Sequence, residues 1–243
     1  MDSGYYSVLH SAQQRHWWYA ARRRILASVV ETIVAQGLPK GKIYDLGCGV
    51  GANLEMLSAF GEVVGVDGSP EAVGFCHERG YTGVRQEDLN HLSGIEDESA
   101  KLVVLADVIE HLDDENPALV AAKRLLAPGG ALLVTVPAYE WLWSPADDLN
   151  HHKRRYTEGQ LRRVIERHFR IERSTYFNTF LFGTVLAGRL VEKVLKRGGD
   201  DAAELPPAPV NAVLDRIFGA EKVVVPRVHL PFGVSILCVA RRD

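Results

Sequence analysis

The chain has 243 residues, of which 47% are hydrophobic and 24% are charged. This length and composition support a full core and fit one α/β domain with an elaboration, or at most two small domains. Its 28 basic residues are outnumbered by 31 acidic ones, giving a net charge of −3. The chain has no general attraction for polyanions, so we expect no nucleic-acid partner. Three cysteines lie far apart without a C-x-x-C, which predicts neither a disulfide framework nor a zinc site.

The N-terminus is polar and aromatic, and it does not read as a signal peptide. No apolar run approaches the ~20 residues that a membrane span requires. We therefore expect a reduced, cytoplasmic protein, whose closest approach to a bilayer is peripheral contact.

An aromatic segment opens the chain and includes Trp17 and Trp18. Three arginines, Arg22–Arg24, follow it, and apolar residues then recur at helical spacing over Ile25–Ile33. This spacing predicts an N-terminal helix packed on a sheet. The aromatic side chains either anchor that helix or belong to a segment, residues 1–35, that caps a ligand site.

The stretch Lys42–Gly51 reads K-I-Y-D-L-G-C-G-V-G. It predicts a short buried strand, a glycine turn and a helix over 52–60, which is the first unit of a nucleotide-binding α/β sheet. The spacing is G-x-G-x-G, and an acid, Asp45, stands directly before the turn. A carboxylate there would repel a pyrophosphate and attract an ammonium group.

Six further strand patterns follow, and helical patterns separate most of them. The second strand ends at Asp67, about twenty residues beyond the glycine turn, where an acid can reach ribose hydroxyls. The alternative is that Asp67 only caps the next helix, for which Ser69 and Pro70 are better placed. The expected strands are 62–67, 83–89, 102–106, 131–136, 170–176 and 234–240, and the expected helices between them are 70–79, 116–126 and 157–168.

The segment D-L-G-C-G-V-G resembles motif I of the class I S-adenosyl-L-methionine (SAM)-dependent methyltransferases. The L-A-P-G-G before the strand at 131–136 resembles a second signature of that family. The resemblance is close over 42–136. It implies an α/β fold with a seven-stranded Rossmann-like sheet, helices on both faces, and SAM as the cofactor. SAM carries an amino group and a sulfonium but no phosphate, which suits the acidic turn.

The resemblance also implies which residues bind SAM. Arg22 or Arg23 would meet the SAM carboxylate, Asp67 the ribose, and Asp88 the adenine amino group. From the residues alone, Asp88 is equally well a solvated loop acid. The full expected set is Trp18, Arg22, Asp45, Gly47, Cys48, Gly49, Asp67, Gly68, Asp88, Leu89 and Asp107.

Acceptor chemistry is expected beyond the fourth strand and in the loop 137–156, which is rich in acids, imidazoles and indoles. His111, His151 and His152 are the candidate bases, in no firm order, and the alternative is a solvated loop whose aromatics dock on the core. We expect no metal site. The weaker alternative is Mg²⁺ at Asp107, Glu110 and His111, which one helical turn would place on one face.

The two last strands are separated by residues 177–233, far more than a hairpin needs. Helices are expected at 179–196 and from Asn211, joined by a hinge-like link over 198–209. We expect a single domain, 1–243, with the SAM-binding core at 40–176 and 234–243 and the insertion as a lid. Its apolar first helix requires a partner surface: the domain itself, a second subunit in a homodimer, an apolar substrate, or a membrane face.

The expected activity is SAM-dependent O-, N- or C-methylation of a small molecule, such as a secondary metabolite, lipid or sugar precursor. Catalysis would rest on alignment of the acceptor with the sulfonium and on removal of its proton. The alternative is a protein of the same fold that binds or cyclises a metabolite without net methyl transfer.

Overall fold

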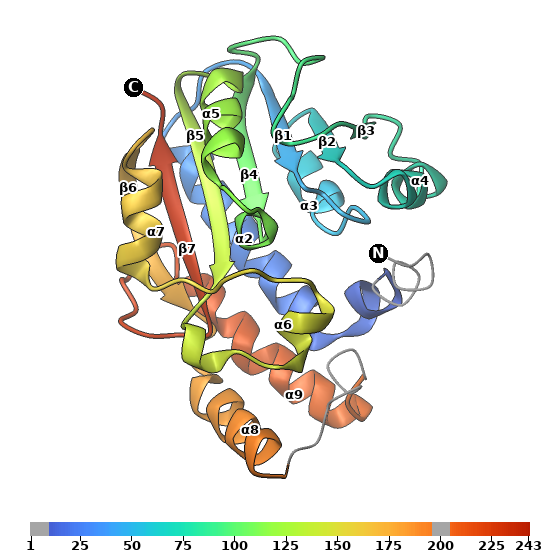
Figure 1. The fold of residues 1–243 in the computed structure, drawn as a ribbon, viewed down its shortest axis with the longest axis vertical. Helices are drawn as coiled ribbons and strands as arrows, with labels where there is room; N and C mark the ends of the chain where they lie inside the picture. Colours follow the sequence, from blue (N-terminus) through green and yellow to red (C-terminus); the bar gives the residue numbers. More distant parts are fainter. Residues whose placement is uncertain (1–9, 196–204) are drawn as a thin grey trace.

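The structure is a computed structural model that describes residues 10–195 and 205–243. One seven-stranded sheet has the order β3-β2-β1-β4-β5-β7-β6 (Figure 1). Only the pairings of β7 with β5 and β6 are antiparallel, and the others are parallel. This confirms the predicted fold class. The strands are β1 (Lys42–Leu46), β2 (Val63–Asp67), β3 (Arg85–Gln86), β4 (Ala100–Ala106), β5 (Leu126–Pro137), β6 (Arg170–Phe177) and β7 (Ser235–Arg241).

Helices cover both faces of this sheet. In Figure 1, α5 and α7 lie in front of the strands and α2 lies behind them. The α-helices are α2 (Trp17–Ala35), α3 (Leu54–Ser58), α4 (Pro70–Glu78), α5 (Asn116–Leu125), α6 (Pro145–Leu149), α7 (Glu158–Ile165), α8 (Phe182–Leu195) and α9 (Ala208–Gly219). Short 3₁₀ turns occur at η1 (Ile109–His111), η2 (Glu140–Leu142) and η4 (Ala220–Val223).

The helix starts follow from local sequence. Ser69 caps α4, its side chain accepting the N–H of Ala72, and Pro70 fills the first helical position. Thr157 and Gln160 form the predicted capping box of α7. That helix ends at Ile165, three residues before the predicted end. The third strand, expected over seven residues, pairs only at Arg85 and Gln86.

The parallel strands bring their carboxyl ends to one edge of the sheet, the lower edge in Figure 1. Asp45 lies in β1, Asp67 ends β2, and Asp107 follows β4. Helices α6, α8 and α9 gather beyond this edge. In open α/β sheets this is where ligands bind.

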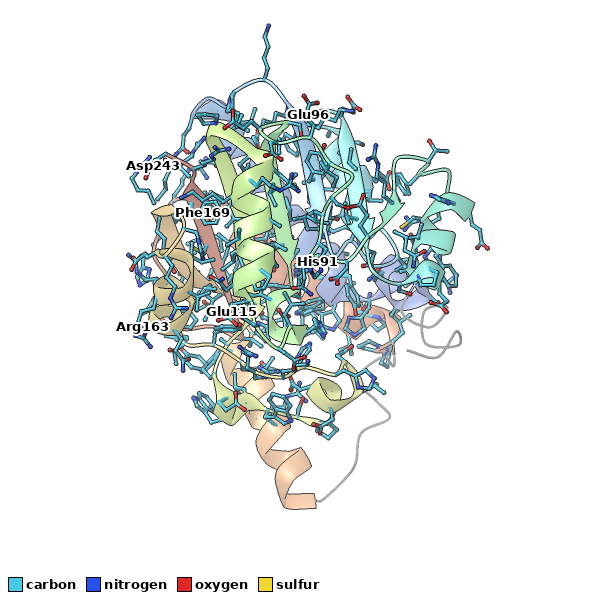
Figure 2. All side chains as sticks on the ribbon, turned by 45° about the horizontal axis from the view of Figure 1, so that its top comes forward. His91, Glu96, Glu115, Arg163, Phe169 and Asp243 are labelled. Atoms are coloured by element: carbon cyan, nitrogen blue, oxygen red, sulfur yellow. The ribbon has the colours of Figure 1, made fainter. Side chains whose placement is uncertain are left out.

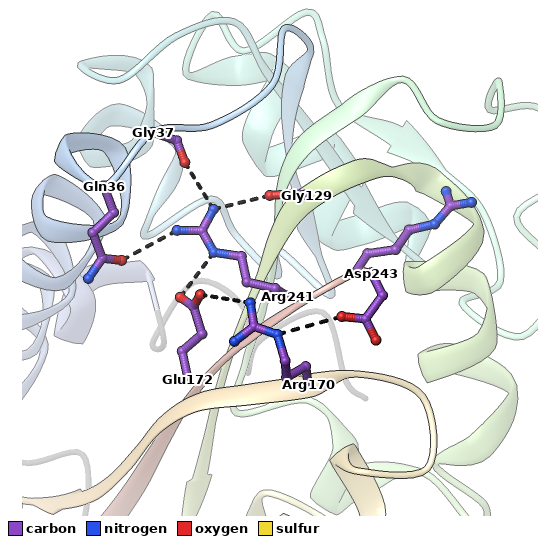
Figure 3. Close-up of a pocket in the computed structure, with 8 residues that line it drawn as sticks. Gln36, Gly37, Gly129, Arg170, Glu172, Arg241 and Asp243 are labelled. Carbon is purple, nitrogen blue, oxygen red and sulfur yellow. Dashed lines mark hydrogen bonds and ion pairs between the residues drawn. The ribbon is translucent and has the colours of Figure 1, made fainter.

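A cavity lies at the opposite edge of the sheet, where β7 ends (Figure 3). It measures about 570 Å³, and Arg241 is its central side chain. The guanidinium of Arg241 is buried and donates to Glu172, Gly37 and Gly129 at 3.0–3.1 Å. Because these partners occupy the arginine, the network joins β6, β7 and the end of α2 and serves the fold.

The insertion between β6 and β7 packs its second helix on the N-terminal helix. The backbone N–H of Trp17 donates to Asn211 Oδ1 at 2.9 Å. Arg24 pairs with Asp215 at 2.8 Å, and the rings of Trp17 and Phe218 meet edge to face. The N-terminal segment and the insertion therefore contact each other directly.

The first insertion helix begins at Phe182, so the predicted start at Thr179 is wrong. Asn178 has a left-handed backbone with φ of 57°. The buried carboxylate of Glu221 accepts the N–H groups of Asn178 and Phe180, both at 2.7 Å. The left-handed backbone at Asn178 is not helical, and Glu221 pairs the amides of this turn before the helix begins. The predicted glycine stop at 198–199 and most of the predicted link lie outside the described residues.

Within the described part of the chain, no helix is both long and apolar enough to cross a membrane.

Candidate cofactor and acceptor site

The glycine turn after β1 has a left-handed backbone at Gly47, Gly49 and Gly51, with φ of 75°, 54° and 80°. Glycine adopts this conformation without the steric cost of a side chain. A Cβ at Gly47 would also lie 2.6 Å from a methyl group of Val108. A Cβ at Gly49 would meet nothing within 4 Å. The turn is therefore packed against the protein at Gly47 and open at Gly49.

Asp67 holds the turn to the end of β2. Its two oxygens accept the N–H of Gly49 at 2.8 Å and the N–H of Ser69 at 2.9 Å. A carboxylate has about four lone-pair positions, so two acceptor positions remain. The capping alternative is thus partly realised, while the ribose role stays a prediction. Gly68, also in the predicted set, lies between these partners.

Asp45 is almost fully buried at the head of the turn. Among the described residues, neither of its carboxylate oxygens has a hydrogen-bond partner. Burial raises the pKa of Asp45 to about 7, opposed by Arg22 and reinforced by Asp67. A buried acid without a donor is costly to ionise, so a cationic ligand group beside it would be favoured.

Arg22 connects the N-terminal helix to the sheet. Its guanidinium is buried and contacts Asp107 at 2.7 Å and the Thr135 hydroxyl at 2.8 Å. Thr135 in turn donates to Asp107 at 3.0 Å. The ring of Trp18 lies 5.2 Å from the guanidinium, within cation–π range. The structure thus brings together three predicted residues, Trp18, Arg22 and Asp107. It adds Thr135, which the sequence did not indicate, because a single threonine in an apolar strand gives no sign of a site.

His111 and His152 meet beside this group, their ring centroids 4.8 Å apart. His152 Nδ1 lies 2.8 Å from Asp147 Oδ1. Asp147 is buried and also binds Arg155 through two N–H···O contacts, at 2.8 and 2.9 Å. Burial alone would raise the pKa of Asp147, but hydrogen bonds from His152, Arg155 and Ser144 hold it well below its usual range.

Asp147 and Arg155 lie in the loop 137–156, where acceptor chemistry was expected, but they were not among the predicted site residues. The signal was present: an acid stands five residues before His152 and eight before Arg155. What the sequence does not reveal is that all three bury their polar atoms together.

Glu110 is completely buried next to the histidine pair, and in the described structure neither oxygen has a hydrogen-bond partner. Burial, and then the charge of Asp107, raise its pKa well above the usual value. Burial and His152 lower the pKa of His111 to about 4, so this imidazole is neutral at pH 7. Ligand atoms of Glu110, His111 and His152 lie within 4.8 Å of one another and could hold a divalent ion.

The predicted grouping of Asp107 with Glu110 and His111 on one helical turn is wrong. Asp107 has φ of 58°, and the 3₁₀ turn spans only Ile109–His111. Arg22 and Thr135 occupy the carboxylate of Asp107 instead. His152 takes its place beside Glu110 and His111.

The other predicted residues lie further from these clusters. His151 is exposed and has φ of 55°. Asp88 is exposed and accepts the backbone and side-chain N–H groups of Asn90, both at 2.9 Å. Leu89 beside it is buried. The roles of His151, Asp88 and Leu89 stay predictions.

The loop that carries His152 is anchored at several points. Arg154 pairs with Glu115 at 2.7 Å, and Glu115 is labelled at the start of α5 in Figure 2. Tyr139, with φ of 58°, stacks between Trp141 and Tyr176, each 5.2 Å away. Phe182 of α8 lies edge to face with Trp141 at 6.2 Å. The insertion therefore contributes to an aromatic wall beside the loop.

Comparisons with known proteins agree with this architecture. Residues 44–134 match the family described as methyltransferase domain. An uncharacterized 37.1 kDa protein in transposon TN4556 of Streptomyces fradiae is 33% identical over 135 residues, covering 52% of this chain and 39% of that protein. The mitochondrial ubiquinone biosynthesis O-methyltransferase of Homo sapiens is 29% identical over 144 residues, covering 55% and 38%. The chain thus spans about two fifths of the length of these curated relatives.

A solved SAM-dependent methyltransferase from Archaeoglobus fulgidus superposes with a TM-score of 0.55 at 19% identity, covering 90% of this chain and 94% of that one. At this identity the superposition supports the fold alone. The sheet order, the acid-ended glycine turn and the domain match at 44–134 agree with one another. Residues 44–134 are therefore a methyltransferase domain, and the chain has the fold of the class I SAM-dependent methyltransferases.

Proposed function

We propose that this protein is an enzyme that transfers the methyl group of SAM to a small-molecule acceptor. The observation that carries the proposal is Asp45, a buried carboxylate without a partner at the head of the glycine turn. SAM, the cofactor of this family, offers an α-amino group that would supply the missing positive charge. The open backbone at Gly49 leaves room for the cofactor.

The remaining cofactor contacts follow from the same edge of the sheet. Asp67 retains acceptor positions for the ribose hydroxyls, since Gly49 and Ser69 use only two. Arg22 is held by Asp107 and Thr135, and its Nε has no partner among the described residues. That N–H could donate to the SAM carboxylate. The ring of Trp18 would cover the Arg22 guanidinium.

At the acceptor end, we assign the general base to His152. Asp147 accepts at Nδ1 and fixes the ring, which leaves Nε2 as the second nitrogen for the acceptor proton. His111 stays neutral at pH 7 because burial lowers its pKa. A neutral imidazole beside His152 can receive or orient a hydroxyl or amine. The sulfonium is already activated, so proton removal and alignment suffice.

The insertion would close the acceptor side. Phe182 of α8 touches the aromatic wall at Trp141 and Tyr139, and Phe180 next to it is about half exposed. A Phe182→Ala variant should raise the KM for the acceptor and leave SAM affinity unchanged. The neighbouring residue Leu181 is not substituted in this test, because its side chain is buried in the core and its loss would affect folding. Normal kinetics in the Phe182 variant would show that α8 does not line the acceptor site.

The decisive experiment has two parts. Calorimetry should first detect binding of SAM and of S-adenosylhomocysteine to the purified chain. Radiolabelled SAM should then be incubated with panels of phenols, catechols, amines and carboxylic acids, and labelled products separated. Absence of SAM binding would end the proposal. SAM binding together with conversion of a metabolite that gains no label would instead support the non-transferring alternative.

A further inference from the structure

Two thiols flank the carbonyl of Gly49 in the glycine turn. Cys48 lies in the turn itself, and Cys76 lies on α4. Their Sγ atoms are 3.7 and 3.4 Å from the same Gly49 oxygen. Each thiol also shifts the pKa of the other. Two cysteines distant in sequence therefore form one contact at the cofactor site.

The surrounding backbone leaves room for these sulfurs and little else. A Cβ at Gly51 would lie 3.0 Å from Cys76 Sγ, and a Cβ at Gly65 would lie 3.0 Å from Cys48 Sγ. Both separations are shorter than ordinary carbon–sulfur contacts. Cys76 is fully buried and Cys48 is 6% exposed. The pair occupies a niche that two glycines keep open.

Two packed thiols alone would be unremarkable, since cysteine often fills small apolar sites. Here, however, both sulfurs contact the same Gly49 oxygen, and the interaction between the two thiols shifts their pKa values in opposite directions. The interaction with Cys76, together with burial, raises the pKa of Cys48, and the interaction with Cys48 lowers the pKa of Cys76. Cys76 is thus the more acidic thiol, and thiolate character is what makes a cysteine react with oxidants.

We propose that Cys48 and Cys76 are a reversible dithiol–disulfide pair that hydrogen peroxide oxidises, and that the disulfide weakens SAM binding. The second clause rests on the proposed function, whereas the first stands without it. One thiolate attacks a peroxide oxygen, the O–O bond breaks and hydroxide leaves, giving a sulfenic acid. The second thiol attacks that sulfur, the S–S bond forms and water leaves. Overall, two thiols and one peroxide give one disulfide and two waters.

The link to SAM follows from bond geometry. A disulfide requires the sulfurs to approach to about 2.05 Å, which is shorter than any hydrogen-bond contact. Cys76 is fixed on a helix, so the turn at Cys48 must move toward it. The next residue, Gly49, donates its N–H to Asp67. Closing the disulfide would therefore disturb both the open face of the turn and the predicted ribose acid.

The test uses the full chain treated with hydrogen peroxide under native conditions. We expect the intact mass to fall by about 2 Da, two of the three thiols to be lost, and dithiothreitol to restore both. A peptide carrying Cys48 should be found linked to one carrying Cys76. SAM affinity measured by calorimetry should fall at least about fivefold on oxidation and recover on reduction.

Two single variants provide matched controls. Cys238→Ser removes the third cysteine, which is buried in β7, and should leave the response intact. Cys76→Ser should abolish both the mass change and the affinity change. Three thiols surviving peroxide, or oxidation confined to one cysteine without a link, would overturn the proposal. A disulfide that forms with SAM affinity unchanged would overturn its regulatory half.

The two proposals fail in different ways. If the reduced protein binds no SAM, the proposed function fails, while peptide mapping still decides whether the pair forms. Should Cys76→Ser fold poorly, mapping and thiol counts on the unaltered chain carry the same decision.

Discussion

The cofactor end and the acceptor end of the candidate site are built by different means. At the cofactor end, Asp45 and Asp67 lie at strand ends and the glycine turn contributes backbone amides. At the acceptor end, His152 comes from a long loop and is oriented by Asp147, which Arg155 holds in turn. Backbone geometry positions the groups at the cofactor end, and a buried charge network positions those at the acceptor end. The acceptor end should therefore be more sensitive to single charge changes and freer to vary between relatives.

The largest effect is expected from Asp147→Asn. This change removes the charge that orients His152 and leaves the buried Arg155 without a charged partner. We expect turnover to fall by roughly 10²–10⁴-fold. Asp148→Asn, at the exposed neighbouring position, is the matched control and should retain activity. A folded Asp147 variant with normal kcat would refute the base assignment, with thermal unfolding used to verify folding.

Asp67→Ala tests the cofactor end. The substitution removes acceptors for the Gly49 and Ser69 amides and for the predicted ribose contacts. Together these are worth about 2–4 kcal/mol, or roughly 30- to 1,000-fold in SAM affinity. Glu71 is an exposed acid on the following helix. The SAM affinity of Glu71→Ala, measured by calorimetry, is the reference value. Equal affinities in the two variants would remove Asp67 from the site.

The sequence predicted these two ends unequally for physical reasons. Glycine spacing and acids at strand ends are local, so Asp45, Gly49 and Asp67 could be read directly. The Arg22–Asp107 pair joins residues far apart, and only the family resemblance indicated both. The contacts of Thr135 with Arg22 and Asp107, and the burial of Asp147, depend on tertiary packing that no local sequence pattern encodes. The start of α8 was misplaced because the chain makes a left-handed turn at Asn178, and Glu221, from the far end of the insertion, pairs the amides of that turn.

Glu221→Gln should measure how firmly the insertion is fixed. The buried carboxylate accepts two amides, and a glutamine can offer its oxygen to only part of that pair. We expect a loss of about 1–3 kcal/mol in the free energy of unfolding and little change in SAM affinity. Denaturant titration would measure the change in the free energy of unfolding. Lys222→Gln, at an exposed position beside it, should be neutral, and equal stability of both variants would contradict this role.

A smaller effect is expected from pH. The pKa of Asp45 is about 7, so the carboxylate is mostly protonated at pH 6 and mostly ionised at pH 8. SAM affinity should rise over this interval by up to about tenfold, and the rise should be absent in Asp45→Asn. Without SAM, the folded state retains this proton more tightly than the unfolded state, so its contribution to stability declines from about pH 4 to pH 7. A pH-independent affinity in the unaltered chain would remove Asp45 from contact with the ammonium.

The smallest effect is expected from metal removal. We expect EDTA to leave turnover unchanged, since alignment and His152 suffice for the proposed transfer. Glu110, His111 and His152 could nevertheless hold a divalent ion. Loss of activity on chelation, with recovery on adding Mg²⁺ or Zn²⁺ and no such response in Glu110→Gln, would reverse this expectation.

The contact between α2 and α9 has a consequence for protein engineering and for recombination among relatives. Trp17 with Asn211, and Arg24 with Asp215, are residues from opposite ends of the chain that fit one another. A chimera that exchanges only the insertion would replace Asn211 and Asp215, and one that exchanges only the first 35 residues would replace Arg24 and the ring of Trp17 that packs on Phe218. Functional exchange of acceptor specificity should therefore require the two segments to be inherited as a pair, although nearly two hundred residues of sequence separate them.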